Sequence, residues 1–246
     1  MTLRLNFLGV KLLAPMLLVA VISAAPAGKL FAMSEPVDLE LVLAADGSGS
    51  IDDSELRLQR EGYAAAITHP RILAAIRGGY HQAIALAFVE WGGPFSQHVI
   101  VDWRRIDGAD SARRFAAELV AAPRKAESYN SLSEAIAFST ALIRSNTFEG
   151  RRKIIDISGD GPNMNGRPLA AARAQALAAG ITINALVVRS PGGGYPGPRG
   201  EPLDEHYRND VIAGRGAFVA VAESRAHFAA AILKKMVLEI ALNLSD

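Results

Sequence analysis

Five short stretches of this chain are nearly unbroken runs of apolar residues, and they limit the possible folds more than any other feature. A strand that is apolar on both faces is typical of a parallel sheet covered by helices on each side. An exposed antiparallel sheet would instead alternate apolar and polar residues. The runs cover residues 37–45, 83–89, 153–158, 181–188 and 217–221.

Helical patterns separate these runs. They cover residues 56–67, 111–120, 131–143, 168–179 and 224–242. The third opens with Ser131 and has Glu134 three positions later, the pattern of a capping box. The fourth begins at a proline and stops at Gly180, the usual asymmetry of helix ends. Strands alternating with helices predict a doubly wound α/β fold.

One strand breaks the alternation. Residues 97–103 follow the apolar run at 83–89 too closely for a crossover helix, so we expect this strand, with Trp103, to pair antiparallel at an edge of the sheet. The glycines and prolines of residues 190–202 favour a long exposed loop. The predicted fold is a doubly wound, mostly parallel central sheet with one antiparallel edge strand and helices on both faces.

Composition excludes several classes of function. The 246 residues include no cysteine, which rules out disulfides, a thiol nucleophile and zinc–thiolate sites. The formal net charge of +1 gives no electrostatic reason to expect nucleic-acid binding. We therefore expect no nucleic-acid partner.

The N-terminus has the order of a secretory signal. Arg4 and Lys11 precede an uncharged run, and Ala25-Pro26-Ala27 offers a small-x-small cleavage site. An uncleaved membrane anchor is the alternative, although the run is short for a membrane span and Pro15 interrupts it. We expect residues 1–27 to be a signal peptide, residues 37–244 to form one domain, and the protein to be periplasmic or secreted, with a membrane contact only if the segment stays uncleaved.

Oxygen-bearing side chains gather where two predicted strands end. Asp46, Ser48 and Ser50 alternate after the first strand, so in an extended loop they point the same way. Asp160 follows the strand at 153–158, and ligands of open α/β sheets bind at the carboxyl ends of strands. These hard donors suit magnesium first, or manganese or calcium, rather than zinc.

Asp46-x-Ser48-x-Ser50, a polar residue before the middle helix and Asp160-Gly161 resemble the metal-ion-dependent adhesion site (MIDAS) of von Willebrand factor A-type domains. The segments QREGYAAAI, VEWGGP, EGRRKIIDISGDGPN and KKMVLEIA resemble a family of exported bacterial proteins of uncharacterised activity with this domain. The resemblance implies an extracytoplasmic module that binds a protein partner, whose acidic side chain completes the coordination of the metal.

The resemblance also implies the ligands: Asp46, Ser48, Ser50, Asp160 and, at the position where such domains normally have threonine, Asn130. Gly47 is a second departure, since a bulkier residue is usual there. Both departures bear on metal affinity and leave the expected fold unchanged.

Other interpretations of the same residues stay open. Ser48 or Ser50 could instead cap the next helix, and the site would then be a degenerate, metal-free one. A magnesium-dependent phosphoester hydrolase is the enzymatic alternative, but it lacks a positioned base and a second acidic cluster. The histidines are scattered, and none follows a predicted strand directly. We expect a binding module and not an enzyme. The histidines are His69, His81, His98, His206 and His227.

Overall fold

The computed structural model contains a six-stranded sheet in the order β3-β2-β1-β4-β5-β6. All neighbouring strands are parallel except β2 and β3, which pair antiparallel. The predicted fold class is confirmed, including the antiparallel edge strand that carries Trp103. The strands are β1 (Glu35–Asp46), β2 (Ile84–Trp91), β3 (Gln97–Ile106), β4 (Phe148–Gly159), β5 (Ile181–Val188) and β6 (Val219–Ala222).

The structure describes residues 1–2, 34–49, 51–189 and 195–241, apart from the side chain of Arg225. The fold lies in the unit Met33–Asp246. The expected signal peptide, residues 1–27, lies outside the described residues apart from its first two, and so does Ser50. Among the described helices, none is both long and apolar enough to cross a membrane.

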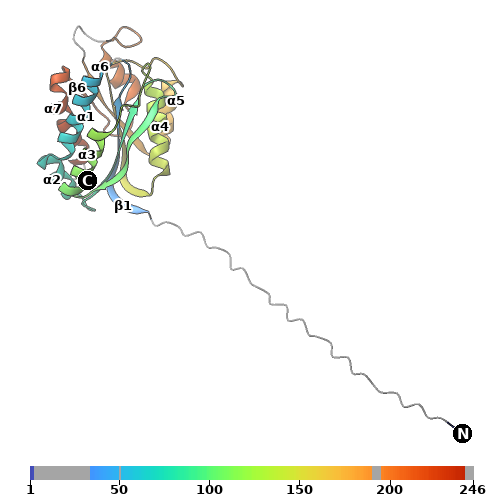
Figure 1. Cartoon of the computed structure of the whole chain (residues 1–246). Helices are drawn as coiled ribbons and strands as arrows, with labels where there is room; N and C mark the ends of the chain where they lie inside the picture. The colour runs from blue at the N-terminus through green and yellow to red at the C-terminus, as the bar shows by residue number, and fades with distance from the viewer. Residues whose placement is uncertain (3–33, 50, 190–194, 242–246) are drawn as a thin grey trace. The chain divides into compact units, whose positions relative to one another are not determined.

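Helices cover both faces of the sheet, with α1, α2, α3 and α7 on one face and α4 and α5 on the other (Figure 1). The helices are α1 (Asp53–Ile67), α2 (Pro70–Arg77), α3 (Ala109–Ala121), α4 (Leu132–Ser145), α5 (Leu169–Ala178), α6 (Leu203–His206) and α7 (Phe228–Ala241). A π-helical turn, η1 (Tyr207–Val211), continues α6, and a 3-10 turn, η2 (Arg225–His227), precedes α7.

The apolar runs form two cores because each buried strand sends alternate side chains to opposite faces. Leu39, Leu41 and Leu43 of β1 pack toward α1 and α7, whereas Val42 and Ala44 pack toward α4 and α5. Each of these side chains is fully buried. The continuous apolar pattern of this strand is therefore a direct consequence of its central position.

Helix α2 was not expected from the sequence. His69 is its N-cap, and its Nδ1 accepts a hydrogen bond from the amide of Arg71 at 3.1 Å. Pro70 follows at the first helical position, where a missing amide hydrogen costs nothing. The sequence did not indicate this helix because histidine is not among the common N-cap residues.

The strand order reverses direction between β1 and β4. From β1 the chain moves outward through β2 to β3, and it then crosses back to β4 and moves outward through β5 to β6. The loops after β1 and β4 therefore leave toward opposite sides, which opens a crevice between their carboxyl ends. Asp46 ends β1, and Asp160 directly follows β4.

Candidate metal site

Asp46 is the centre of the candidate site. Its side chain is 1 % exposed, and its Oδ1 accepts a hydrogen bond from the amide of Ser48 at 2.8 Å. Its Oδ2 is buried and has no hydrogen-bond partner among the residues that the structure describes. A buried carboxylate oxygen without a donor costs free energy, so this atom is expected to receive a ligand from outside the chain.

Asp160 lies close enough to Asp46 to alter its ionisation. Burial, and after it the negative charge of Asp160, raise the pKa of Asp46 to about 7, against hydrogen bonds from Ser48 and the Asp160 amide that lower it. Asp160 is itself 4 % exposed. Both carboxylates also line a cavity of about 30 Å³ between α1 and α7. Two buried carboxylates that repel one another are an arrangement that a divalent cation relieves.

The loop after β1 brings Ser48 into the same site. Ser48 is 1 % exposed, and Arg124 holds the loop by donating from Nη2 to the carbonyl oxygens of Gly47 and Ser48, each at 3.1 Å. Helix α1 is capped by Asp52, whose side chain accepts from the amides of Ser54 and Glu55. Ser48 is therefore not the helix cap. Ser50 lies outside the described residues.

Gly47 has a structural reason to lack a side chain. A Cβ atom at this position would lie 2.8 Å from the Cβ of Ala126, in the segment that leads to Asn130. The amide of Gly49 donates to the carbonyl of Ser128 at 2.9 Å. The missing side chain at Gly47 thus lets the two loops of the candidate site pack closely.

Asn130 comes to the site from the opposite side, at the start of α4. Its side chain is 8 % exposed and lies over Gly161, where an added Cβ atom would be 2.3 Å from Asn130 Nδ2. Its carbonyl accepts from the amide of Met164 at 2.9 Å. Asn130 therefore lies beside the residue that follows Asp160.

The expected capping box at the start of α4 is wrong in its side chains, although Ser131 does occupy the N-cap position. Ser131 Oγ donates to the carbonyl of Asn165 at 2.8 Å, and Glu134 pairs with Arg167 instead of reaching back to the cap. Asn163 Oδ1 accepts from the amide of Ser133 at 2.9 Å in its place. The loop after β4 packs on this end of the helix, and its side chain Asn163 therefore provides the capping hydrogen bond.

Sequence reasoning missed Tyr207. This fully buried side chain donates its hydroxyl hydrogen to the carbonyl of Gly161 at 2.9 Å. Its pKa is raised well above the ordinary value by burial and then by the charges of Asp46 and Asp160. No sequence signal marked it, because it lies 46 residues from Gly161 in a π-helical turn beyond a glycine- and proline-rich stretch.

A wider pocket of about 590 Å³ opens over Ser48 and Asn130. Three of its lining side chains are large and exposed: Tyr129 is 73 % exposed, Met164 59 % and Tyr195 62 %. A polar floor below an apolar rim is common in surfaces that bind other molecules.

Solved structures with the same fold are known. The pilus adhesin SpaC from Lactobacillus rhamnosus GG matches with a TM-score of 0.59 and 14 % identity, over 84 % of this chain and 31 % of that protein. A von Willebrand factor type A protein from Catenulispora acidiphila matches with a TM-score of 0.54 and 14 % identity, over 83 % and 42 %. Proximal thread matrix protein 1 from the mussel byssus, with a zinc-occupied MIDAS motif, matches with a TM-score of 0.53 and 12 % identity, over 83 % and 45 %.

These likenesses show a von Willebrand A-type fold. The chain spans less than half the length of each of the three proteins. No curated protein matches the sequence. The sequence model of one family, described as protein of unknown function (DUF1194), matches residues 36–244, and the chain belongs to this family.

Proposed function

We propose that this chain is an extracytoplasmic module that binds a protein partner through a divalent cation, most simply magnesium. The cation would be held by Asp46, Ser48, Asn130 and Asp160, with Ser50 as a further expected ligand. One observation carries the proposal: the buried Oδ2 of Asp46, which has no hydrogen-bond partner among the described residues and lies within the field of a second carboxylate.

The donor set fits the cation. Two carboxylates, hydroxyls and one amide are oxygen ligands of the kind that magnesium, manganese and calcium prefer. Two negative charges balance a divalent ion, and the protein oxygens leave coordination positions for a carboxylate of the partner. The exposed Tyr129, Met164 and Tyr195 around the pocket support contact with a protein surface rather than with a small ion alone.

The fold adds support for a binding role. One similar structure is a pilus adhesin, and another has a zinc-occupied MIDAS motif. Export is proposed from the basic, apolar and small-residue order at the N-terminus. N-terminal sequencing of the native protein tests this point: a mature chain that begins near Gly28 agrees with it, and an intact Met1 in the cytoplasmic fraction contradicts it.

Calorimetric titration tests the metal. The metal-stripped protein is titrated with magnesium, manganese and calcium, and we expect one site that Asp46→Ala abolishes. Asp110→Ala is the matched control, because Asp110 is an exposed carboxylate on α3. Equal binding by the wild type and Asp46→Ala would refute the site.

Partner binding is tested separately. Capture of proteins from the native envelope fraction is compared with magnesium, with a chelator, and with Asp46→Ala. We expect a partner that is retained only by the wild-type chain in magnesium. A screen of phosphoester substrates under the same conditions distinguishes the hydrolase alternative, since turnover that depends on Asp46 would favour the enzyme.

A further inference from the structure

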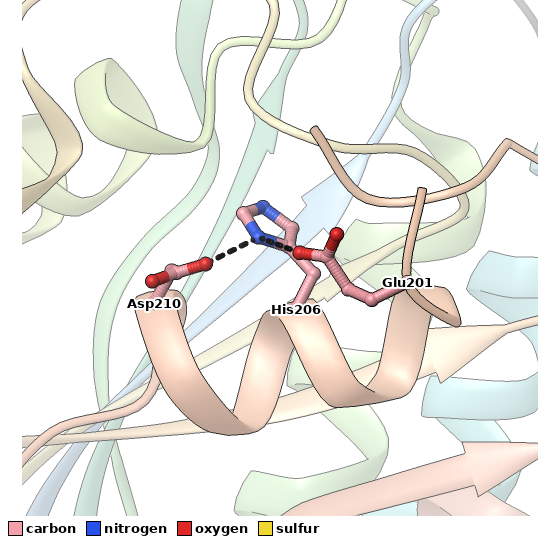
Figure 2. A group of neighbouring side chains, drawn as sticks. All are labelled: Glu201, His206 and Asp210. Carbon is pink, nitrogen blue, oxygen red and sulfur yellow. Dashed lines mark hydrogen bonds and ion pairs between the residues drawn. The ribbon is translucent and has the colours of Figure 1, made fainter. Parts of the chain in front are cut away.

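A second group of potential metal ligands lies in the connection between β5 and β6. Glu201, His206 and Asp210 each offer one ligand atom, and these atoms lie within 4.8 Å of one another. Figure 2 shows the two carboxylates facing the same ring nitrogen of the histidine. This group shares no residue with the candidate site around Asp46.

The backbone orients Glu201 toward the histidine. The amide of Arg199 donates to Glu201 Oε2 at 2.8 Å, and the other oxygen, Oε1, is buried and makes ion pairs with Arg199 at 3.0 Å and His206 at 3.6 Å. The turn that places the Glu201 side chain here requires glycine at two positions. Gly200 has a φ of +82°, and a Cβ atom on Gly197 would lie 2.5 Å from the Glu201 carboxylate. Metal-ligating carboxylates are commonly held by such outer hydrogen bonds.

His206 is the buried member of the group. It is 2 % exposed, and its Nδ1 lies 2.8 Å from Asp210 Oδ2 and 3.6 Å from Glu201 Oε1. The other ring nitrogen points away from both carboxylates (Figure 2) and has no hydrogen-bond partner among the described residues. The ring thus presents one nitrogen to both carboxylates, so that one potential ligand atom from each of the three residues lies in the same place.

A π-helical turn completes the arrangement. The amide of Ile212 donates to the carbonyl of Tyr207 at 3.0 Å, five residues back, where an α-helix would bond four residues back. The turn directly follows His206 and carries Asp210, whose side chain reaches the same ring nitrogen. Single π-turns occur frequently at functional sites.

Arg199 supplies positive charge to the group in this structure. One guanidinium nitrogen lies 3.0 Å from Glu201 Oε1 and donates to Asp210 Oδ2 at 2.8 Å. The Arg199 side chain is 61 % exposed, so it can leave for solvent without crossing the core. The guanidinium group of Arg199 therefore lies between the two carboxylates, and its exposed side chain can be displaced.

We propose that Glu201, His206 and Asp210 bind a second divalent cation of the zinc class, which displaces Arg199. One imidazole nitrogen, two carboxylate oxygens and a water form a four-coordinate set that suits zinc, whereas the all-oxygen donors around Asp46 suit magnesium. Tyr207, the neighbour of His206, donates to Gly161 beside Asp160. An ion at the second site would brace the segment that supports the first.

The test uses the full chain with Asp46→Ala, which removes the first site. Calorimetric titration of this metal-stripped variant with zinc is expected to show one site. Adding Glu201→Gln or His206→Ala should weaken zinc binding at least about ten-fold. Glu201→Gln preserves shape, so it reports on the ligand even if His206→Ala unfolds. Circular dichroism identifies variants that remain folded.

Arg199→Ala separates this proposal from a simple ion-pair network. Removing the competing guanidinium should tighten zinc binding several-fold, whereas a purely structural ion-pair network would lose stability and gain no affinity. Glu223→Gln and His227→Ala are controls, because both residues are exposed. The proposal is overturned if zinc binding is absent with Asp46→Ala, survives Glu201→Gln in the folded protein, or is unchanged by Arg199→Ala. Magnesium binding by the otherwise wild-type Glu201→Gln chain tests the first site independently.

Discussion

Two pairs of buried carboxylates each have one member on β4 or directly after it, and they differ in their source of positive charge. Asp156 on β4 lies near Glu239 of α7, and both are fully buried. Lys235 Nζ lies 2.7 Å from Asp156 Oδ1 and also pairs with Glu239. Four residues further on, Asp160 lies near Asp46 at the end of the neighbouring strand. In the described part of the chain, only hydrogen bonds lower the pKa of Asp46.

Burial is similar at the two pairs, and the source of positive charge is the difference. Burial and a second carboxylate raise the pKa to about 7 both at Asp46 and at Glu239. Both pairs contain carboxylate oxygens with no hydrogen-bond partner among the described residues. The pair under α7 has the ammonium group of Lys235, whose charge lowers the pKa of Glu239. No cationic side chain lowers the pKa of Asp46 in the described part of the chain, so the strand-end pair is suited to a cation that binds reversibly.

Removal of the Lys235 ammonium group should have the largest effect on stability. Lys235→Met leaves Asp156 and Glu239 without their ammonium partner, and we expect the free energy of unfolding to fall by about 3–5 kcal/mol, because an uncompensated charge stays buried. Urea denaturation measures it. Lys234→Met is the matched control, since Lys234 is the exposed neighbour on the same helix. Equal effects of the two substitutions would show that the buried cluster contributes nothing.

Removal of a charge from the strand-end pair, Asp46 and Asp160, should not destabilise the metal-free protein. Asp46→Asn removes one of two repelling carboxylates, so without metal we expect unchanged or slightly increased stability, by up to about 1–2 kcal/mol. At a magnesium concentration one hundred times the dissociation constant, the wild type should gain about 2.7 kcal/mol and Asp46→Asn nothing. Thermal unfolding with magnesium and with a chelator measures both. A large loss for Asp46→Asn in chelator would mean that this carboxylate is structural.

The dependence of stability on pH should distinguish the pairs further. Glu239 faces Lys235, Asp156 and Asn184, with Arg152 and Tyr63 nearby. Its pKa is raised from 4.5 to about 7, so the folded protein retains this proton more strongly than the unfolded chain does. Stability from this group is fully present below pH 4.5 and is lost as pH rises to about 7.

Between pH 4.5 and pH 7.5 we expect the free energy of unfolding of the wild type to fall by about 3 kcal/mol through this group, and Glu239→Gln to abolish this fall. The measured quantity is the difference between wild type and variant in urea denaturation at each pH, under chelator. Titration of groups far from Glu239 cancels in this difference. A wild type and variant with parallel pH profiles would contradict a raised pKa at Glu239.

The strand-end pair was predictable from the sequence, and the pair under α7 was not. Asp46 and Asp160 end apolar runs, and the reversal of strand order places such ends together. Asp156 stands inside an apolar run, and Lys235 and Glu239 stand in a helix where charged residues normally face solvent. Their burial depends on how α7 lies on β4 and β5, which no local pattern contains.

The same contrast holds for smaller features. The sheet and its antiparallel edge follow from local patterns of burial, whereas the hydrogen bonds of Ser131 and the convergence of Glu201 with His206 depend on loops that pack from elsewhere. Residues whose position is set by the end of a single strand can therefore be predicted from the sequence. Residues whose role depends on contact between distant loops require the structure.

Asn130 gives the smallest expected effect and the finest test of the strand-end site. Von Willebrand A-type metal sites normally have threonine here, and a hydroxyl has a shorter reach than an amide. Because Asn130 packs over Gly161, Asn130→Thr should remove part of this contact and cost about 0.5–1 kcal/mol of stability. If the oxygen at this position ligates the ion, magnesium affinity should change about ten-fold, or 1.4 kcal/mol. We expect an increase with Asn130→Thr and a decrease with Asn130→Ala in calorimetric titration. Identical magnesium affinities in all three proteins would show that Asn130 only shapes the loop, and the ligands would then be confined to the ends of β1 and β4.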